Sequence, residues 1–189
     1  QALSQNYRCS ILSGMAEREG ERLYNTAVLV SRGSFLGRYR KIHLSDLEKT
    51  LFDPGEKNGV FNVDGIPIGV QICFDLWFPE ISREQLRQGA QLLCALANFG
   101  GETTCSIARV RAIENMTPLV LCNRVGREQL PNLDAEFLGR SAIIQQDGTF
   151  CSEAAPGART VASRQLALGR HRGNVICSDL MQEISRHTK

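Results

Sequence analysis

A short apolar run that ends at a cysteine constrains the fold of this chain more than any other feature. Residues 66–72 are mostly apolar, partly β-branched, and follow an Asp-Gly turn pair, which is typical of a buried strand. Pro79 and Glu80 then begin an amphipathic helix, because proline suits the first helical turn and glutamate suits its positive end. Cys73 therefore lies where a buried strand bends toward a helix.

The position of Cys73 allows two interpretations. Ligands and reactive groups gather at the carboxyl ends of strands in α/β folds, which makes this thiol a candidate nucleophile. Free cysteines are also among the most buried residue types, so Cys73 could equally be a small core residue. A lone cysteine does not decide between the two.

A second stretch changes that balance. Residues 37–44 read Gly-Arg-Tyr-Arg-Lys-Ile-His-Leu, and Glu48 and a Phe-Asp-Pro-Gly segment follow. Together with the cysteine stretch, they resemble the carbon–nitrogen hydrolase (nitrilase) superfamily. In that superfamily a Tyr-Arg-Lys-x-His-Leu strand carries a catalytic lysine, and a hydrophobic-Cys-aromatic-Asp-x-x-Phe-Pro-Glu elbow carries the catalytic cysteine. The resemblance continues, in family order, through residues 111–115, 123–126 and 137–141.

The resemblance implies an αββα sandwich, commonly paired into dimers. The pattern of elements favours the same α+β class, because hairpins are frequent and strands alternate with helices only in part. We therefore expect one nitrilase-like domain over residues 1–189, as a homo-oligomer such as a homodimer.

Periodicity and turn residues predict the individual elements. Helices are expected at 1–7, 79–89, from Thr103 or Thr104 to 116, and 180–187. Strands are expected at 9–12, 24–30, 35–44, 60–63, 66–72, 92–97, 118–125, 137–145, from 149 onward, and 160–168. Polar loops are expected at 45–58 and 127–136, and a basic turn at 170–173. In the third helix, Ile107, Val110 and Ile113 share one face.

The chemistry of a thiol nucleophile depends on its charge state. A free thiol with a pKa of about 8.5 is only a few per cent thiolate at neutral pH, and a neighbouring ammonium favours the thiolate. The resemblance implies that Lys41 is this ammonium, and that Lys41 and the backbone amide of Phe74 stabilise an oxyanion. The alternative is a solvated lysine, the commonest fate of that residue.

Further site residues follow from the resemblance. Glu48 matches a family glutamate that orients the substrate and the lysine, although it could also be an ordinary loop carboxylate. Asn98 and Phe99 resemble positions that line the substrate pocket, and Trp77 is another candidate, although a single tryptophan more often serves packing. Arg111 and Glu114, three residues apart on a helix, are expected to form a structural ion pair.

One expected catalytic residue has no match. The family's general base is a glutamate in an opening strand–helix–strand segment, upstream of the part that residues 1–14 match. Glu17 and Glu19 fall too late in the chain, and Glu80 belongs to the elbow. We therefore expect a sequence truncated at its N-terminus, without this base and without the first strand of a sheet.

Composition excludes several other classes. The 189 residues carry a net charge of +2 without a basic stripe, so nothing indicates nucleic-acid binding. Apolar runs such as 92–97 are too short to span a membrane. The seven cysteines are odd in number and lack a Cys-x-x-Cys spacing, and the three histidines are scattered. This pattern predicts a reduced, cytoplasmic protein with no metal site and no cofactor.

Two functional hypotheses remain. The first is hydrolysis of a non-peptide C–N bond in a small linear amide, an N-carbamoyl compound or a nitrile, through a thioester on Cys73. The second is a catalytically incomplete binding or assembly module that keeps the fold. A thiol redox protein is the weakest alternative, because no paired cysteine is present.

Overall fold

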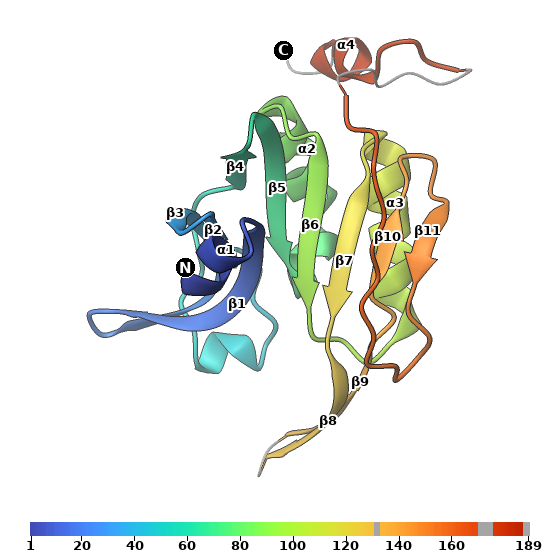
Figure 1. Cartoon of the computed structure of the whole chain (residues 1–189). Coiled ribbons are helices and arrows are strands. Elements are labelled where there is room, and N and C mark those ends of the chain that lie inside the picture. Colours follow the sequence, from blue (N-terminus) through green and yellow to red (C-terminus); the bar gives the residue numbers. More distant parts are fainter. Residues whose placement is uncertain (131–132, 170–175, 187–189) are drawn as a thin grey trace.

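The computed structural model describes residues 1–130, 133–169 and 176–186. Within these residues the largest sheet has the strand order β11-β10-β7-β6-β5-β4 (Figure 1). Its strands are β4 (Gly59–Val63), β5 (Ile66–Ile72), β6 (Leu92–Ala97), β7 (Leu119–Asn123), β10 (Ala142–Ile144) and β11 (Phe150–Glu153).

The centre of this sheet is parallel. Strands β5, β6 and β7 run in the same direction, with Ile72 beside Leu96 and Ala97 beside Asn123. This register brings the carboxyl ends of the three strands to one edge of the sheet. The outer strands β4, β10 and β11 pair in antiparallel fashion.

Two helices, α2 (Pro79–Arg87) and α3 (Glu102–Asn115), cover one face of the large sheet (Figure 1). The core on this side includes Leu86 of α2, Ala108 and Ala112 of α3, and Leu93 of β6. Small side chains on α3 allow close approach to the sheet, since a packed interior leaves few voids.

The start and the apolar face of α3 differ from the predictions. Its N-cap is Gly101 rather than a threonine. Val110 and Ile113 are 47% and 43% exposed. The apolar face that the periodicity indicated is therefore only partly buried, since Ile107 packs against the core, and the buried side of the helix includes Ala108 and Ala112.

The other face of the large sheet packs against a second, antiparallel sheet. This sheet contains β1 (Ser10–Glu19), β2 (Arg22–Ser31) and β3 (Ser34–Arg40). Ala27 and Tyr39 from it form one core with Val70 and Ile72 of β5. A short helix, α1 (Ala2–Asn6), lies at the β2–β3 turn, where Gly33 N–H donates to Ser4 Oγ at 2.9 Å. The helix–sheet–sheet order agrees with the predicted sandwich.

Some predicted boundaries were wrong. The expected loop at 127–136 is part of a hairpin of β8 (Val125–Leu130) and β9 (Leu133–Leu138), which projects from the end of β7 (Figure 1). The ion pair Arg127–Asp134 joins its strands, and their mostly polar residues lack the apolar alternation that marks a half-buried strand. No strand forms at 160–168, where Val161 is 95% exposed and no neighbouring strand pairs with it.

Other boundaries shifted. The strand expected at 9–12 continues to Glu19, and the strand expected at 35–44 ends at Arg40. The terminal helix α4 covers Leu180–Ser185. The basic turn predicted at 170–173 lies outside the described residues. No helix in the described part of the chain is long and apolar enough to cross a membrane, and the single domain over 1–189 stays a prediction.

Candidate active site

The cysteine lies at a sharp turn between a strand and a helix. Strand β5 ends at Ile72, a 3-10 helix η2 (Cys73–Trp77) follows, and α2 begins at Pro79. Cys73 is a free thiol and has φ of +49°. This left-handed conformation costs a non-glycine residue about 1–2 kcal/mol. Strained strand-to-helix turns of this kind are used elsewhere to present a nucleophile at a sheet edge.

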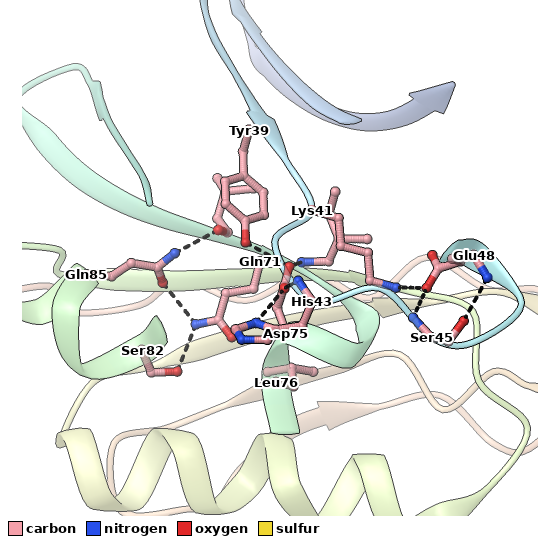
Figure 2. A network of polar contacts seen from close by, with 12 residues as sticks. Tyr39, Lys41, His43, Ser45, Glu48, Gln71, Asp75, Leu76, Ser82 and Gln85 are labelled. Atoms are coloured by element: carbon pink, nitrogen blue, oxygen red, sulfur yellow. Dashed lines mark hydrogen bonds and ion pairs between the residues drawn. The ribbon is translucent and has the colours of Figure 1, made fainter. Parts of the chain in front are cut away.

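Lys41 is buried, with 2% of the residue exposed, so the solvated alternative was wrong. It follows β3 directly. Its backbone N–H donates to Asn25 O at 2.8 Å, and its carbonyl accepts from Gly55 N–H at 2.8 Å. Its ammonium donates to Glu48 Oε2 at 2.5 Å (Figure 2). Hydrogen bonds thus hold both the backbone and the ammonium group of Lys41 in place.

Glu48 is more than a loop carboxylate. It begins the 3-10 helix η1 (Glu48–Thr50), and it accepts from Asn25 Nδ2 at 2.9 Å and from Ser45 N–H at 2.9 Å, in addition to Lys41. Burial raises the pKa of Glu48, but these donors and the charge of Lys41 outweigh burial and leave the pKa below its ordinary value. The lowered pKa favours the carboxylate form of Glu48.

The charge state of Cys73 differs from the expectation. Burial raises the pKa of this thiol above its ordinary value. The backbone N–H of Asn98 and the positive charge of Lys41 lower the pKa, whereas Glu48 and Asp75 add to the rise. Lys41 thus acts in the expected direction, but burial is the larger effect. The expected lowering of the Cys73 pKa is corrected, because burial leaves this pKa above its ordinary value.

Asp75 is the main residue that the sequence analysis missed. It is fully buried, and it accepts hydrogen bonds from Tyr39 Oη at 2.8 Å, from His43 N–H at 2.8 Å and from Ile72 N–H at 3.0 Å (Figure 2). Burial raises its pKa, and the same donors and Lys41 oppose the rise. An aspartate just after a buried apolar strand is a usable signal, because a buried carboxylate is costly unless it is hydrogen-bonded.

The elbow is also attached to helix α3. Arg111 Nε donates to Leu76 O at 2.8 Å, and Arg111 pairs with Glu114 at 2.6 Å. The predicted ion pair is confirmed, and the contact with the elbow is an addition to it. Trp77 is 45% exposed and its Nε1–H donates to Thr104 Oγ1 at 3.2 Å. The Phe74 ring lies 5.9 Å from the Trp77 ring.

The loop after β6 lies at the same sheet edge as the cysteine. Asn98 is exposed there, and a hydrogen bond from its backbone N–H lowers the pKa of Cys73. The backbone of Phe99 donates to Asn123 Oδ1 and accepts from Asn123 Nδ2, both at 3.1 Å. Asn123, buried at the end of β7, was also missed as a supporting residue. A buried amide at a strand end is a weak signal, because its partners are distant in sequence.

Two surface hollows lie away from the cysteine. One of about 230 Å³ is lined by Thr117 and its neighbours, and one of about 520 Å³ is lined by Arg40 and its neighbours. Cys73 lines neither. The substrate-binding roles expected for Phe74, Asn98, Phe99 and Trp77 therefore stay predictions.

The chain is similar to known proteins over most of its length. Residues 1–173 match the family described as carbon–nitrogen hydrolase. A nitrilase from Pyrococcus abyssi is 36% identical over 159 residues, which cover 84% of this chain and 59% of that protein. The crystal structure of a carbon–nitrogen hydrolase from Helicobacter pylori G27 aligns with a TM-score of 0.77 at 28% identity, covering 82% of this chain and 60% of that one.

One similar structure contains a covalent adduct. It is a mutant of the amidase from Nesterenkonia sp. AN1, with the acetamide moiety of fluoroacetamide added at the active-site cysteine. It aligns with a TM-score of 0.72 at 26% identity, covering 82% of this chain and 62% of that one. The chain thus spans less than two thirds of the length of these proteins.

Proposed function

Because this chain belongs to the carbon–nitrogen hydrolase family, we propose that its protein hydrolyses a non-peptide C–N bond of a small linear amide through a thioester on Cys73. The observation that carries the proposal is the buried Lys41 ammonium, which pairs with the partly exposed Glu48 and opposes the rise that burial causes in the pKa of Cys73 at the strand-to-helix elbow. N-carbamoyl compounds and nitriles are the other substrate classes within this proposal.

In the proposed reaction, Cys73 Sγ attacks the amide carbonyl carbon. The thiol proton passes to a general base, a role that the family resemblance gives to a glutamate with no counterpart in residues 1–189. Since burial raises the pKa of Cys73, the proton leaves as the S–C bond forms. The intermediate then expels ammonia or an amine, which takes up a proton, and water hydrolyses the thioester to release the acid and restore the thiol.

Two donors are assigned to the oxyanion of the intermediate. One is the Lys41 ammonium, oriented by Glu48. The other is the backbone N–H of Phe74, because the first N–H groups of a helix have no acceptor within that helix and Phe74 lies in the first turn of η2. Removing a preorganised donor of this type typically costs about 3–4 kcal/mol of transition-state stabilisation.

The Nesterenkonia amidase supports the covalent step. Its active-site cysteine carries the acetamide moiety of a small amide reagent, and its fold aligns with most of this chain. The similarity to a protein named nitrilase keeps nitriles among the candidate substrates.

The test is ammonia release from acetamide and butyramide by the protein that contains this chain. Cys73→Ala should abolish release, whereas Cys9→Ala, which changes an exposed cysteine, should leave it unchanged. An acyl-enzyme adduct on the peptide with Cys73, detected by mass spectrometry after rapid quenching, is also expected. Ammonia release that persists in Cys73→Ala would overturn the proposal.

A binding or assembly module is the second candidate function. The raised pKa of Cys73 favours it. Amide binding by calorimetry, without ammonia release and without an adduct on Cys73, would support this alternative. The homo-oligomer, the small-molecule partner and the cytoplasmic location stay predictions.

A further inference from the structure

We propose that Asp75 is a positioning residue that holds the segment carrying Lys41 against the elbow carrying Cys73. The inference deepens the proposed function and rests on it. It concerns a side chain that has no assigned role in the reaction described above.

The hydrogen bonds of Asp75 bracket both reactive groups. Tyr39, which donates its hydroxyl proton to Asp75, lies two residues before Lys41, and His43, which donates its backbone N–H, lies two residues after it. Ile72, which donates its backbone N–H, lies directly before Cys73. One carboxylate thus joins the two segments that the reaction needs close together (Figure 2).

The segment after Lys41 depends on these contacts because it has left the sheet. Strand β3 ends at Arg40, and Lys41 keeps one backbone hydrogen bond to Asn25 of β2, but no β-ladder positions the residues after Lys41. The His43 ring stacks on Phe78, with the ring centroids 3.5 Å apart. This stacking and the bond from His43 N–H to Asp75 both attach the segment to the elbow.

A carboxylate suits this position better than a neutral side chain. Ionised aspartate only accepts hydrogen bonds, and its two oxygens match the donors that converge here. An asparagine would turn one oxygen into a donor, which would face an N–H or O–H group. Asp75→Asn keeps the size of the side chain and should therefore disturb the junction specifically.

A role of Asp75 through its charge and a role through the positioning of Lys41 predict opposite changes in the pKa of Cys73, so an experiment can distinguish them. The negative charge of Asp75 raises the pKa of Cys73, as does that of Glu48, whereas the positive charge of Lys41 lowers it. If Asp75 acted only through its charge, Asp75→Asn would make the thiol more acidic. If Asp75 positions Lys41, the substitution displaces the ammonium and makes the thiol less acidic.

The experiment measures the rate of Cys73 alkylation by iodoacetamide against pH. Mass spectrometry of the peptide with Cys73 separates this thiol from the others. We expect Asp75→Asn to slow alkylation at neutral pH about tenfold, which corresponds to about one pKa unit. Tyr39→Phe, which keeps the Asp75 charge and removes one donor, should slow it less. In amide hydrolysis, kcat should fall with little change in KM.

The matched control is Ser82→Ala. Ser82 is buried on α2 and accepts a hydrogen bond from Gln71 of β5 at 2.8 Å, so its loss also removes a buried hydrogen bond beside β5. Among the described residues, no hydrogen bond joins its side chain to residues 39–43. Ser82→Ala should lower the melting temperature and leave the alkylation profile unchanged.

Faster or unchanged alkylation in folded Asp75→Asn would overturn the positioning role. If Asp75→Asn does not fold by circular dichroism, Tyr39→Phe decides by the same criterion. The thiol measurement does not require hydrolysis of an amide. If the wild type does not hydrolyse amides but Asp75→Asn still slows the alkylation of Cys73, the proposed function is rejected and the positioning role is retained.

Discussion

The Lys41 ammonium donates a hydrogen bond of 2.5 Å to the Glu48 carboxylate, although only 2% of Lys41 is exposed. A buried ammonium is costly in free energy unless an anion and hydrogen bonds compensate for its lost hydration. Asn25 and Ser45 hold the carboxylate in turn. This arrangement keeps a positive charge near Cys73 without exposing it to solvent.

Substitution of Glu48 by glutamine should destabilise the protein. The change leaves the ammonium of Lys41 buried without its anion, and breaking a buried pair costs about 3 kcal/mol or more. Urea unfolding of the variant measures the loss. Asp46→Asn is the matched control, because Asp46 pairs with Lys49 at the surface and such pairs contribute about 0–1 kcal/mol. Equal effects of the two substitutions would contradict a structural role for the buried pair.

Acid should weaken the sheet formed by β1, β2 and β3 through Glu17. A hydrogen bond from Arg40 lowers the pKa of Glu17 from 4.5 to about 2, against an opposing effect of burial. Since the pKa is lower in the folded state, the contribution to stability is complete above about pH 4.5 and is lost as the pH falls toward about 2. After allowance for solvent screening we expect about 1–2 kcal/mol.

Urea unfolding at several pH values between 2 and 6 checks this prediction, with pH limits set by the Glu17 shift. Glu17→Gln should reduce the dependence of stability on pH in this range. Glu21→Gln, in the exposed turn between β1 and β2, should not. An identical pH dependence in the wild type and Glu17→Gln would count against the assignment.

Arg111→Met should loosen the elbow. The substitution fills similar space but removes the donor to Leu76 O and the partner of Glu114. An acceptor left unsatisfied in the interior costs about 1–3 kcal/mol. Thermal unfolding should show the loss, and amide hydrolysis should fall with it. Arg87→Met, which changes an exposed pair with Glu84, should have an effect below about 1 kcal/mol.

Asn123→Asp should disturb the loop after β6. The new carboxylate oxygen would face the carbonyl oxygens of Phe99 and Gly139, which now accept from Asn123 Nδ2 at 3.1 and 2.7 Å. We expect a loss of about 2–3 kcal/mol in the free energy of unfolding and a higher KM for amides. Asn62→Asp keeps the acceptor for Gly65 N–H and should be nearly neutral. An unchanged free energy of unfolding in Asn123→Asp would show that the two hydrogen bonds between Asn123 and the Phe99 backbone are dispensable.

Local patterns predicted much of the fold. The strand at 92–97 and the hairpin around residues 64–65 were confirmed, because apolar runs and an Asp-Gly turn are read from neighbouring residues. The nitrilase-like fold was confirmed by the alignment with the H. pylori enzyme. The β8–β9 hairpin was missed, because its residues are mostly polar and do not alternate with apolar ones, although Phe137 is buried.

The sequence by itself determined that Cys73 would end a buried strand and begin a turn toward a helix, since both elements depend on local periodicity and on Pro79. Tertiary structure alone decided that Lys41 is buried, that Asp75 joins its segment to the elbow, and that the pKa of Cys73 is raised rather than lowered. The partners in these contacts come from separate parts of the chain. Their effects depend on how completely the packed sheets exclude water, a quantity that no short stretch of sequence encodes.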